Sequence, residues 1–206
     1  MLNSLSQTLL KAASPGIPDF YQGTELWDFS LVDPDNRRPV DFDKRSVMLE
    51  GLRLAEQERG TLALARELLA DMADGRVKLF LVWKTLCFRR DHRNLFEAGK
   101  YLPLEVQGER SDNVCAFERY NDGESVIAVA PRFFSRLGAV PAGGEPWQDS
   151  RLVIPFESAG CAYRNIFTGK RVVTSPREGQ TILPLADVLA DFPVALLEAV
   201  REELPR

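Results

Sequence analysis

Residues 14–42 read SPGIPDFYQGTELWDFSLVDPDNRRPVDF and decide how the rest of the chain can be organised. The stretch holds four prolines and two glycines, so no continuous helix can run through it. Pro15 and Gly16 end any helix that precedes them, and residues 17–21 are short, apolar and aromatic, which predicts a buried strand. Gly23 then lets the chain turn sharply. The sequence therefore predicts a strand followed by a long loop.

The loop has the composition of a binding site. From Gly23 it runs for roughly fifteen residues or more, a length that favours a function over a mere connection. Arginine forks, carboxylates and an aromatic ring are the groups that hold a polyhydroxylated sugar. A surface loop held together by its own Asp–Arg pairs has the same composition and is the alternative. The candidate substrate-binding residues are Tyr21, Gln22, Glu25, Asp35, Asn36, Arg37 and Arg38.

These residues carry a resemblance to a known family. A helix, residues 14–25 and residues 33–42 together resemble the last β/α unit of the α-amylase clan of glycoside hydrolases. Within that clan they are most similar to the maltooligosyl trehalose synthase family, which turns the reducing-end α-1,4 linkage of a maltodextrin into an α,α-1,1 linkage. Residues 88–104 and 192–197 resemble the C-terminal part of the same family.

The resemblance implies a C-terminal portion of such an intramolecular transglucosylase, an isomerase. Clan members use three carboxylates on barrel strands four, five and seven, and no motif of this chain matches them. The resemblance therefore implies that the chain is inactive by itself and holds no catalytic residue. A non-catalytic carbohydrate-binding or scaffolding β-domain is the alternative function.

The resemblance implies a specific role for one residue of the loop. In exo-acting clan members, an arginine in an Arg-x-Pro-hydrophobic-x-aromatic run pairs with an aspartate and closes the pocket around the terminal sugar. Residues 37–42 match that run and place Arg37 at the position of the arginine. Its partner would lie outside this chain, so we expect Arg37 to bond with Asp33 or Asp35, or to be disordered.

Composition limits the possible partners. The chain has 206 residues, of which 45% are hydrophobic and 27% charged, as in a soluble globular protein. A whole eight-stranded barrel needs about 250 residues. The net charge of −4 gives no reason to expect nucleic acid, and a neutral maltooligosaccharide suits it better. The sequence shows no membrane span or secretory signal, so we expect no membrane partner and a cytoplasmic location.

Cysteine and histidine are scarce. Cys87, Cys115 and Cys161 are odd in number and have apolar or aromatic neighbours, which predicts buried free thiols rather than a disulfide. The single histidine, His92, has no close Cys/His cluster, so neither a zinc site nor a cofactor is expected. His92 and the arginines around it are interpreted as a solvated helix end, and an acid–base role for His92 is the alternative.

The N-terminal half has helical periodicity. Residues 2–13 form a helix with one apolar face, which in a barrel would pack on the sheet. Without the barrel, we expect local disorder, a rearrangement, or self-association through residues 1–30. Asp43 predicts the N-cap of a helix that Gly60 ends, and further helices follow at 61–74 and 76–90. The stripe of Phe80, Trp83 and Phe88 is interpreted as core rather than as a sugar platform.

After Gly99 the pattern alternates, which predicts an antiparallel β-sandwich. Residues 121–123 and 168–169 are hairpin signals. In the loop 135–149, Trp147 could stack on a sugar, although capping the sheet edge is the commoner role for such a residue. The expected strands are residues 101–106, 114–120, 125–130, 151–155, 163–167, 171–174, 181–185 and 194–199.

The predicted fold class is α+β. A helical segment, comprising the last β/α unit of an incomplete TIM barrel and further helices, precedes an antiparallel β-sandwich. The predicted domains are the end of a catalytic barrel at 1–42, a helical unit at 43–98 and the sandwich at 99–206.

Overall fold

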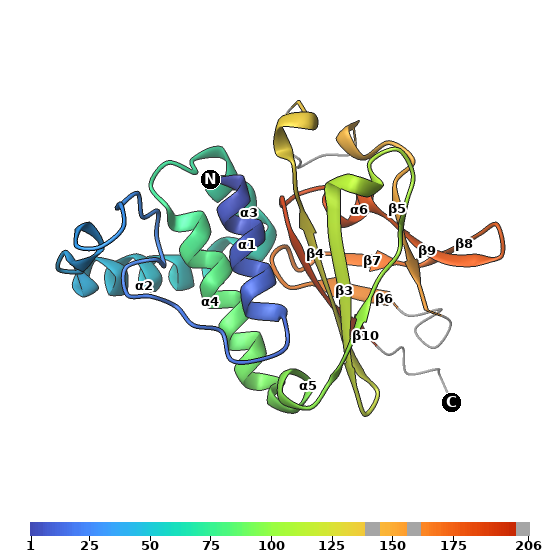
Figure 1. Ribbon diagram of the computed structural model, residues 1–206, viewed down its shortest axis with the longest axis horizontal. Coiled ribbons are helices and arrows are strands. Elements are labelled where there is room, and N and C mark those ends of the chain that lie inside the picture. Colours follow the sequence, from blue (N-terminus) through green and yellow to red (C-terminus); the bar gives the residue numbers. More distant parts are fainter. Residues whose placement is uncertain (139–144, 156–161, 201–206) are drawn as a thin grey trace.

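A computed structural model describes residues 1–138, 145–155 and 162–200 of the chain. A group of helices packs against one side of a two-sheet β-sandwich (Figure 1). The predicted α+β class and the antiparallel sandwich are therefore confirmed.

The helices follow the predicted pattern, except that the helix expected at 61–74 ends at Ala70. Gly60 and Gly75 have positive φ angles of 81° and 83° and separate neighbouring helices. The predicted cap of α2 is wrong by two residues, because it is the side chain of Asp41, not Asp43, that accepts a hydrogen bond from the Lys44 amide. The helices are α1 (Leu2–Ala13), α2 (Phe42–Arg59), α3 (Thr61–Ala70), α4 (Arg76–Asp91), α5 (Arg93–Glu97) and α6 (Leu185–Val188).

The strands form two antiparallel sheets. The six-stranded sheet has the order β1-β3-β4-β10-β6-β7, and the four-stranded sheet has the order β2-β5-β9-β8. Their bounds are β1 (Lys100–Pro103), β2 (Val106–Gln107), β3 (Val114–Asn121), β4 (Glu124–Pro131), β5 (Arg151–Ile154), β6 (Ala162–Asn165), β7 (Arg171–Val173), β8 (Ser175–Arg177), β9 (Gln180–Pro184) and β10 (Ala195–Val200).

Two details of the sheets differ from the prediction. The segment expected as one strand at 101–106 is divided into β1 and β2, which belong to different sheets. Strand β8 was not predicted, since Pro176 argues against a strand and is tolerated here at the edge of its sheet. The predicted β3–β4 hairpin is confirmed, with Asp122 and Gly123 at φ 46° and 83°.

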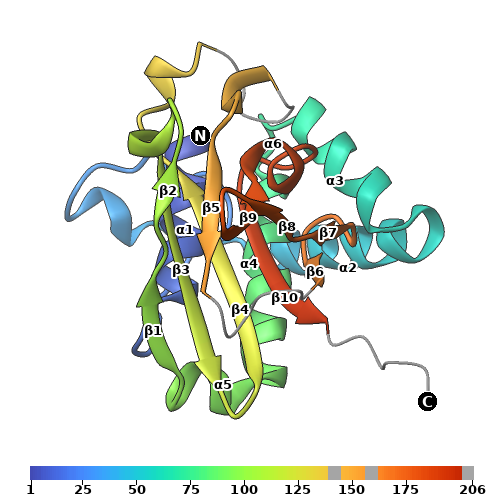
Figure 2. The same cartoon turned by 90° about the vertical axis from the view of Figure 1, so that its right-hand side faces the viewer.

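The six-stranded sheet is buried on both faces. In β4, Val126 and Ala128 contact the helical core, whereas Ile127 and Val129 contact the core between the sheets. Figure 2 shows the four-stranded sheet in front and the helices behind. Because β4 is covered on both faces, it is buried from Ser125 to Pro131, and this explains why its sequence from Val126 onward is apolar.

Helix α1 finds a partner within the chain. Leu5, Leu9 and Ala13 are fully buried in the core that the helices share with the six-stranded sheet, and α1 lies beside α4 (Figure 1). The apolar face of α1 is therefore covered within the chain. The expected self-association through residues 1–30 stays a prediction.

The predicted strand at 17–21 is wrong. Residues 17–21 form no strand, and the side chains of Ile17 and Tyr21 are 97% and 47% exposed. A strand requires a neighbour for its backbone groups, and none of the described residues pairs with this segment. The segment is held instead by Arg89, whose Nη1 donates to the Ala12 carbonyl oxygen at 2.9 Å and whose Nη2 donates to that of Gly16.

Candidate functional site

The predicted loop encloses a polar cavity of about 360 Å³ against the start of α2, here called the loop cavity. Gln22, Asn36 and Arg38 of the predicted set line it. Side chains outside that set complete the lining, among them Trp27, Asp28, Asp41, Lys44 and Arg45. The first turn of α2 therefore belongs to the site. The sequence does not indicate this, because the helix predicted from Asp43 begins a separate predicted unit at 43–98.

Arg45 holds the two sides of the loop together. Its Nε donates to Glu25 Oε2 at 2.9 Å, its Nη2 to the Gly23 carbonyl oxygen at 2.8 Å, and its Nη1 to the Asp41 carbonyl oxygen at 3.0 Å. Glu25 was predicted to bind substrate, but it is half-buried and engaged with Arg45. The ion pair holds Glu25 beside the loop cavity, and its predicted contact with substrate stays a prediction.

Trp27 supplies the aromatic wall of the loop cavity. Its indole Nε1 donates to the Met72 carbonyl oxygen at 2.6 Å, which fixes the ring against the turn between α3 and α4. A Cβ at Gly75 would lie 3.1 Å from the Trp27 amide nitrogen, so a glycine permits this close approach. A fixed ring beside carboxylates and amides is a common arrangement in sugar-binding sites.

The two arginines of the loop pair with their own aspartates. Arg37 Nη2 donates to Asp33 Oδ2 at 3.0 Å, which is one of the bonds expected for it. Arg38 pairs with Asp35, which also accepts a hydrogen bond from the Leu31 amide at 2.8 Å. Arg37 is 70% exposed and Arg38 is 75% exposed, so both remain available to a ligand or to another chain segment.

Two polar groups of the loop cavity have distinctive environments. Two hydrogen bonds from Ser30 lower the pKa of Asp28, and the one from the side chain has a larger effect than the one from the backbone. This carboxylate is therefore an acceptor at neutral pH. The Asn36 side-chain oxygen is buried and accepts no hydrogen bond from the described residues. Of these two groups, the exposed Asp28 carboxylate is the acceptor that a ligand rich in hydroxyl donors can reach.

Tyr21 lies in a different cavity, also of about 360 Å³, between α1 and the start of α4. Lys11 and Lys78 line it together with the hydroxyl groups of Ser4, Thr8 and Thr24, and it is here called the lysine cavity. The structure therefore separates Tyr21 from Gln22, although they are neighbours in sequence. Lys78 was not predicted, since nothing local distinguishes a lysine on an amphipathic helix.

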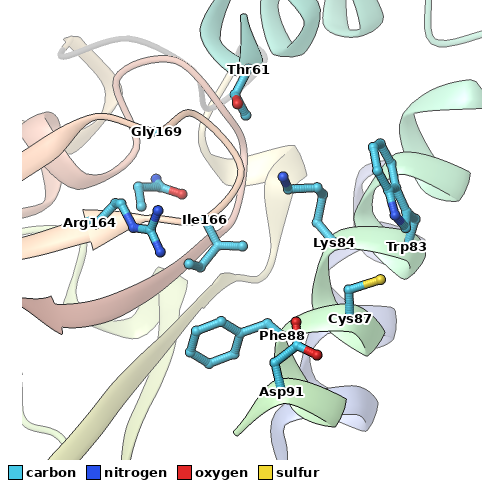
Figure 3. A pocket seen from close by; sticks show the side chains of 10 residues that line it. Thr61, Trp83, Lys84, Cys87, Phe88, Asp91, Arg164, Ile166 and Gly169 are labelled. Carbon is cyan, nitrogen blue, oxygen red and sulfur yellow. The ribbon is translucent and has the colours of Figure 1, made fainter. Parts of the chain in front are cut away.

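A third cavity of about 360 Å³ lies between α4 and the β6–β7 hairpin (Figure 3). Lys84 points from α4 into it, and Arg164 faces it from the hairpin. Each of these cations has a carboxylate partner: Lys84 Nζ lies 2.8 Å from Glu56 Oε1, and Arg164 Nη2 lies 2.6 Å from Glu198 Oε2. The third cavity therefore has no unmatched cation to attract an anion.

The aromatic predictions have mixed outcomes. Phe80 and Phe88 are core residues, as predicted, whereas Trp83 is only half-buried and lines the third cavity. The sugar-stacking role considered for Trp147 is wrong, because its side chain is fully buried in the core between the sheets. The alternative of a sugar-binding β-domain thereby loses its aromatic platform.

His92 is less solvated than predicted. It follows α4, stacks on Phe88 at 4.1 Å between ring centroids, and is 26% exposed. Its Nε2 lies 3.5 Å from Glu198 Oε1 and its Nδ1 lies 3.6 Å from Glu124 Oε2. The helix end therefore packs against the β3–β4 hairpin and β10.

The structure also bears on the cysteines, on metal binding and on membrane spans. Cys87 and Cys115 are free thiols but are half-buried rather than buried, and Cys161 lies outside the described residues. Within residues 1–138, 145–155 and 162–200, no group of three or more metal-binding side chains is present. None of the helices in those ranges has the length and apolar character to cross a membrane.

Comparison with solved structures first defines the class of fold. An Anoxybacillus α-amylase matches 99% of this chain, over 33% of its own length, with a TM-score of 0.57. At 16% identity this likeness shows the fold alone. The helices and sandwich of this chain are thus the fold of a corresponding part of an α-amylase. No family model matches the sequence.

Closer similarity points to one kind of enzyme. A Mycobacterium tuberculosis protein named as a maltooligosyl trehalose synthase is 33% identical over 195 residues, which are 95% of this chain. The structure of maltooligosyltrehalose synthase from Arthrobacter ramosus is 34% identical over 97% of this chain, with a TM-score of 0.71. This chain is therefore related to a C-terminal portion of maltooligosyl trehalose synthase, as the motifs predicted. It spans about a fifth of the length of the curated relatives that it matches.

Proposed function

We propose that the chain serves as the C-terminal portion of a maltooligosyl trehalose synthase, an intramolecular transglucosylase acting on maltooligosaccharides in the cytoplasm. The observation that carries this proposal is similarity to such enzymes over 95% of the chain. The loop cavity supports it, because Trp27, Asp28, Asn36 and Arg38 combine an aromatic wall with acceptors and an exposed guanidinium. These groups would bind the sugar rather than react with it.

The carboxylates of the loop cavity support a binding role. Retaining glycoside chemistry needs a pair of carboxyl groups, one of which has a raised pKa and serves as the acid. The pKa of Asp28 is lowered, chiefly by the side-chain hydrogen bond with Ser30, which makes it a poor acid. Asp41 accepts a hydrogen bond from the Lys44 amide at 2.8 Å and caps α2. We therefore propose that the isolated chain does not isomerise its substrate.

Incubation of the 206-residue chain with maltopentaose tests this part of the proposal. Trehalose formation consumes the reducing end, so the number of reducing ends should stay constant with the chain alone. A loss of reducing ends would contradict the proposal and would require a catalytic pair among the carboxylates near the loop cavity.

The binding role of Arg37 is tested in a complete enzyme. The chain would replace the matching fifth of the Arthrobacter ramosus enzyme, and Arg37→Ala would be compared with Arg93→Ala in that chimera. The control is matched, because Arg93 is 76% exposed and also pairs with an acid four residues away. Arg37→Ala should lower kcat/KM about tenfold or more, as loss of a charge-assisted hydrogen bond would, and Arg93→Ala should leave it unchanged. Equal values for both variants would remove Arg37 from the sugar site.

A further inference from the structure

The lysine cavity contains a buried cation without a counter-ion. Lys78 is only 8% exposed, and its Nζ donates to the Leu26 carbonyl oxygen at 3.2 Å. Among residues 1–138, 145–155 and 162–200, no carboxylate forms an ion pair with it. By contrast, Lys84, six residues further along the same helix, pairs with Glu56. A buried ammonium group has three donors and is costly to desolvate unless they are used.

The surroundings of Lys78 add positive potential. Lys78 lies in the first turn of α4, where the helix dipole is itself positive. Lys11 lines the same cavity from α1, with its Nζ 3.9 Å from the centroid of the Phe20 ring. The acidic group in the lining is Asp19, which is exposed and can turn toward water. The lining therefore has two cations and one anion.

The pKa of Lys78 is consistent with this description. Burial lowers the pKa of Lys78, and the charge of Lys11 lowers it further. Asp28 and Glu25 act in the opposite direction through space. An anion bound beside the ammonium group would oppose both lowering effects and would favour its charged form.

The neutral groups of the lysine cavity are mostly hydrogen-bond donors. Ser4, Gln7 and Thr8 present two hydroxyls and an amide from α1. The Thr24 hydroxyl also lines the cavity, but it already donates to the Tyr21 carbonyl oxygen at 2.7 Å. A phosphate group has several acceptor oxygens that can use such donors at once, and lysine binds phosphate as a point charge. We propose that the lysine cavity is a binding site for a phosphate group, either inorganic or carried by a sugar, with Lys78 and Lys11 as its cationic ligands.

Thermal unfolding of the 206-residue chain tests the site through ligand-induced stabilisation. A ligand that binds the folded state raises the melting temperature in a concentration-dependent way. Sodium phosphate should raise it more than sodium chloride of equal ionic strength. Fitting the dependence on phosphate concentration gives an apparent Kd for each variant. Glucose 6-phosphate compared with glucose then shows whether a sugar-borne phosphate also binds.

Substitutions in the lysine cavity test whether the stabilisation by phosphate arises from binding there. Lys78→Met should weaken phosphate binding about tenfold or more, and its fold should persist because an apolar side chain replaces a buried charge. Lys78→Arg should retain binding, Lys11→Gln should weaken it, and Asp19→Asn should strengthen it. Lys84→Met is the matched control and should bind phosphate like the unaltered chain.

Two results would overturn the assignment. One is equal stabilisation by phosphate and chloride in the unaltered chain. The other is the same phosphate effect in Lys78→Met and in the unaltered chain. Either result would leave Lys78 as a structural lysine that serves the Leu26 carbonyl. Because maltooligosaccharide is absent from the measurement, neither result bears on the proposed enzymatic role.

Discussion

At the scale of single residues, the start of α2 shows how two neighbouring aspartates differ in role. Asp41 accepts a hydrogen bond from the Lys44 amide, whereas Asp43 lies within the first helical turn. We expect Asp41→Ala to lower the free energy of unfolding by about 1 kcal/mol, as the loss of an N-cap does. Asp43→Ala should cost only about 0.3 kcal/mol through the helix dipole. Urea titrations of both variants measure the difference, and equal losses would contradict the assignment of the cap.

The residues of the candidate sites could be predicted only where local sequence decides their position. A bond from Arg37 to Asp33 or Asp35, or disorder of Arg37, was expected from the resemblance, and the bond to Asp33 is the outcome that the structure shows. Arg45, Trp27 and Lys78 gain their importance from distant partners, namely Glu25, the Met72 carbonyl and the Leu26 carbonyl. No spacing within the sequence reveals such contacts.

At the scale of elements, Asp191 joins α3 to the β6–β7 turn. Its carboxylate lies 2.6 Å from Arg66 Nη2 and 2.6 Å from Lys170 Nζ. Burial raises the pKa of Asp191, but hydrogen bonds from Lys170 and Arg66 outweigh that effect, and the net pKa is lowered. Its contribution to stability is therefore complete above its ordinary pKa of about 3.9 and is lost as the pH falls through the lowered value.

We accordingly expect Asp191→Asn to reduce the free energy of unfolding at pH 7 by roughly 1 to 2 kcal/mol, since both cations are partly exposed and screened. Below about pH 4 the gap between the variant and the unaltered chain should shrink. Urea titrations at several pH values measure this gap. A gap that persists unchanged to pH 2 would show that the ion pairs are not its source. The same comparison can be made in a chain that carries both Arg66→Met and Lys170→Met. In that background, Asp191→Asn should no longer show a loss of stability that shrinks below about pH 4.

Helices and strands could be predicted where residues close in sequence determine them, and could not where they depend on a distant segment. Helices α2 and α4 and the β3–β4 hairpin follow from capping, periodicity and turn residues close in sequence. The segment 17–21 has the composition of a strand but is not one, because a strand exists only beside another strand. The division of β1 from β2 depends likewise on which sheet each strand joins.

At the scale of the whole molecule, exposed apolar side chains remain near the N-terminus. Ile17 is 97% exposed and Phe29 is 81% exposed. We propose that the isolated chain self-associates through residues 1–30, since exposed apolar groups of this size favour contact with another surface. Sedimentation should show association that weakens in Ile17→Ser and Phe29→Ser.

The control for self-association is Val173→Ser, because Val173 is 60% exposed but lies on β7 in the sandwich. This variant should associate as strongly as the unaltered chain. A chain that stays monomeric at every concentration would contradict the proposal, as would equal weakening by all three substitutions.

The central position of β4 has a consequence for unfolding. Its side chains contribute alternately to the helical core and to the core between the sheets, so neither core can be disrupted without exposing one face of this strand. The molecule should therefore lose its structure cooperatively, in one calorimetric transition. The backbone amides of β4 should be the last to exchange with deuterated solvent, because only global opening would release them.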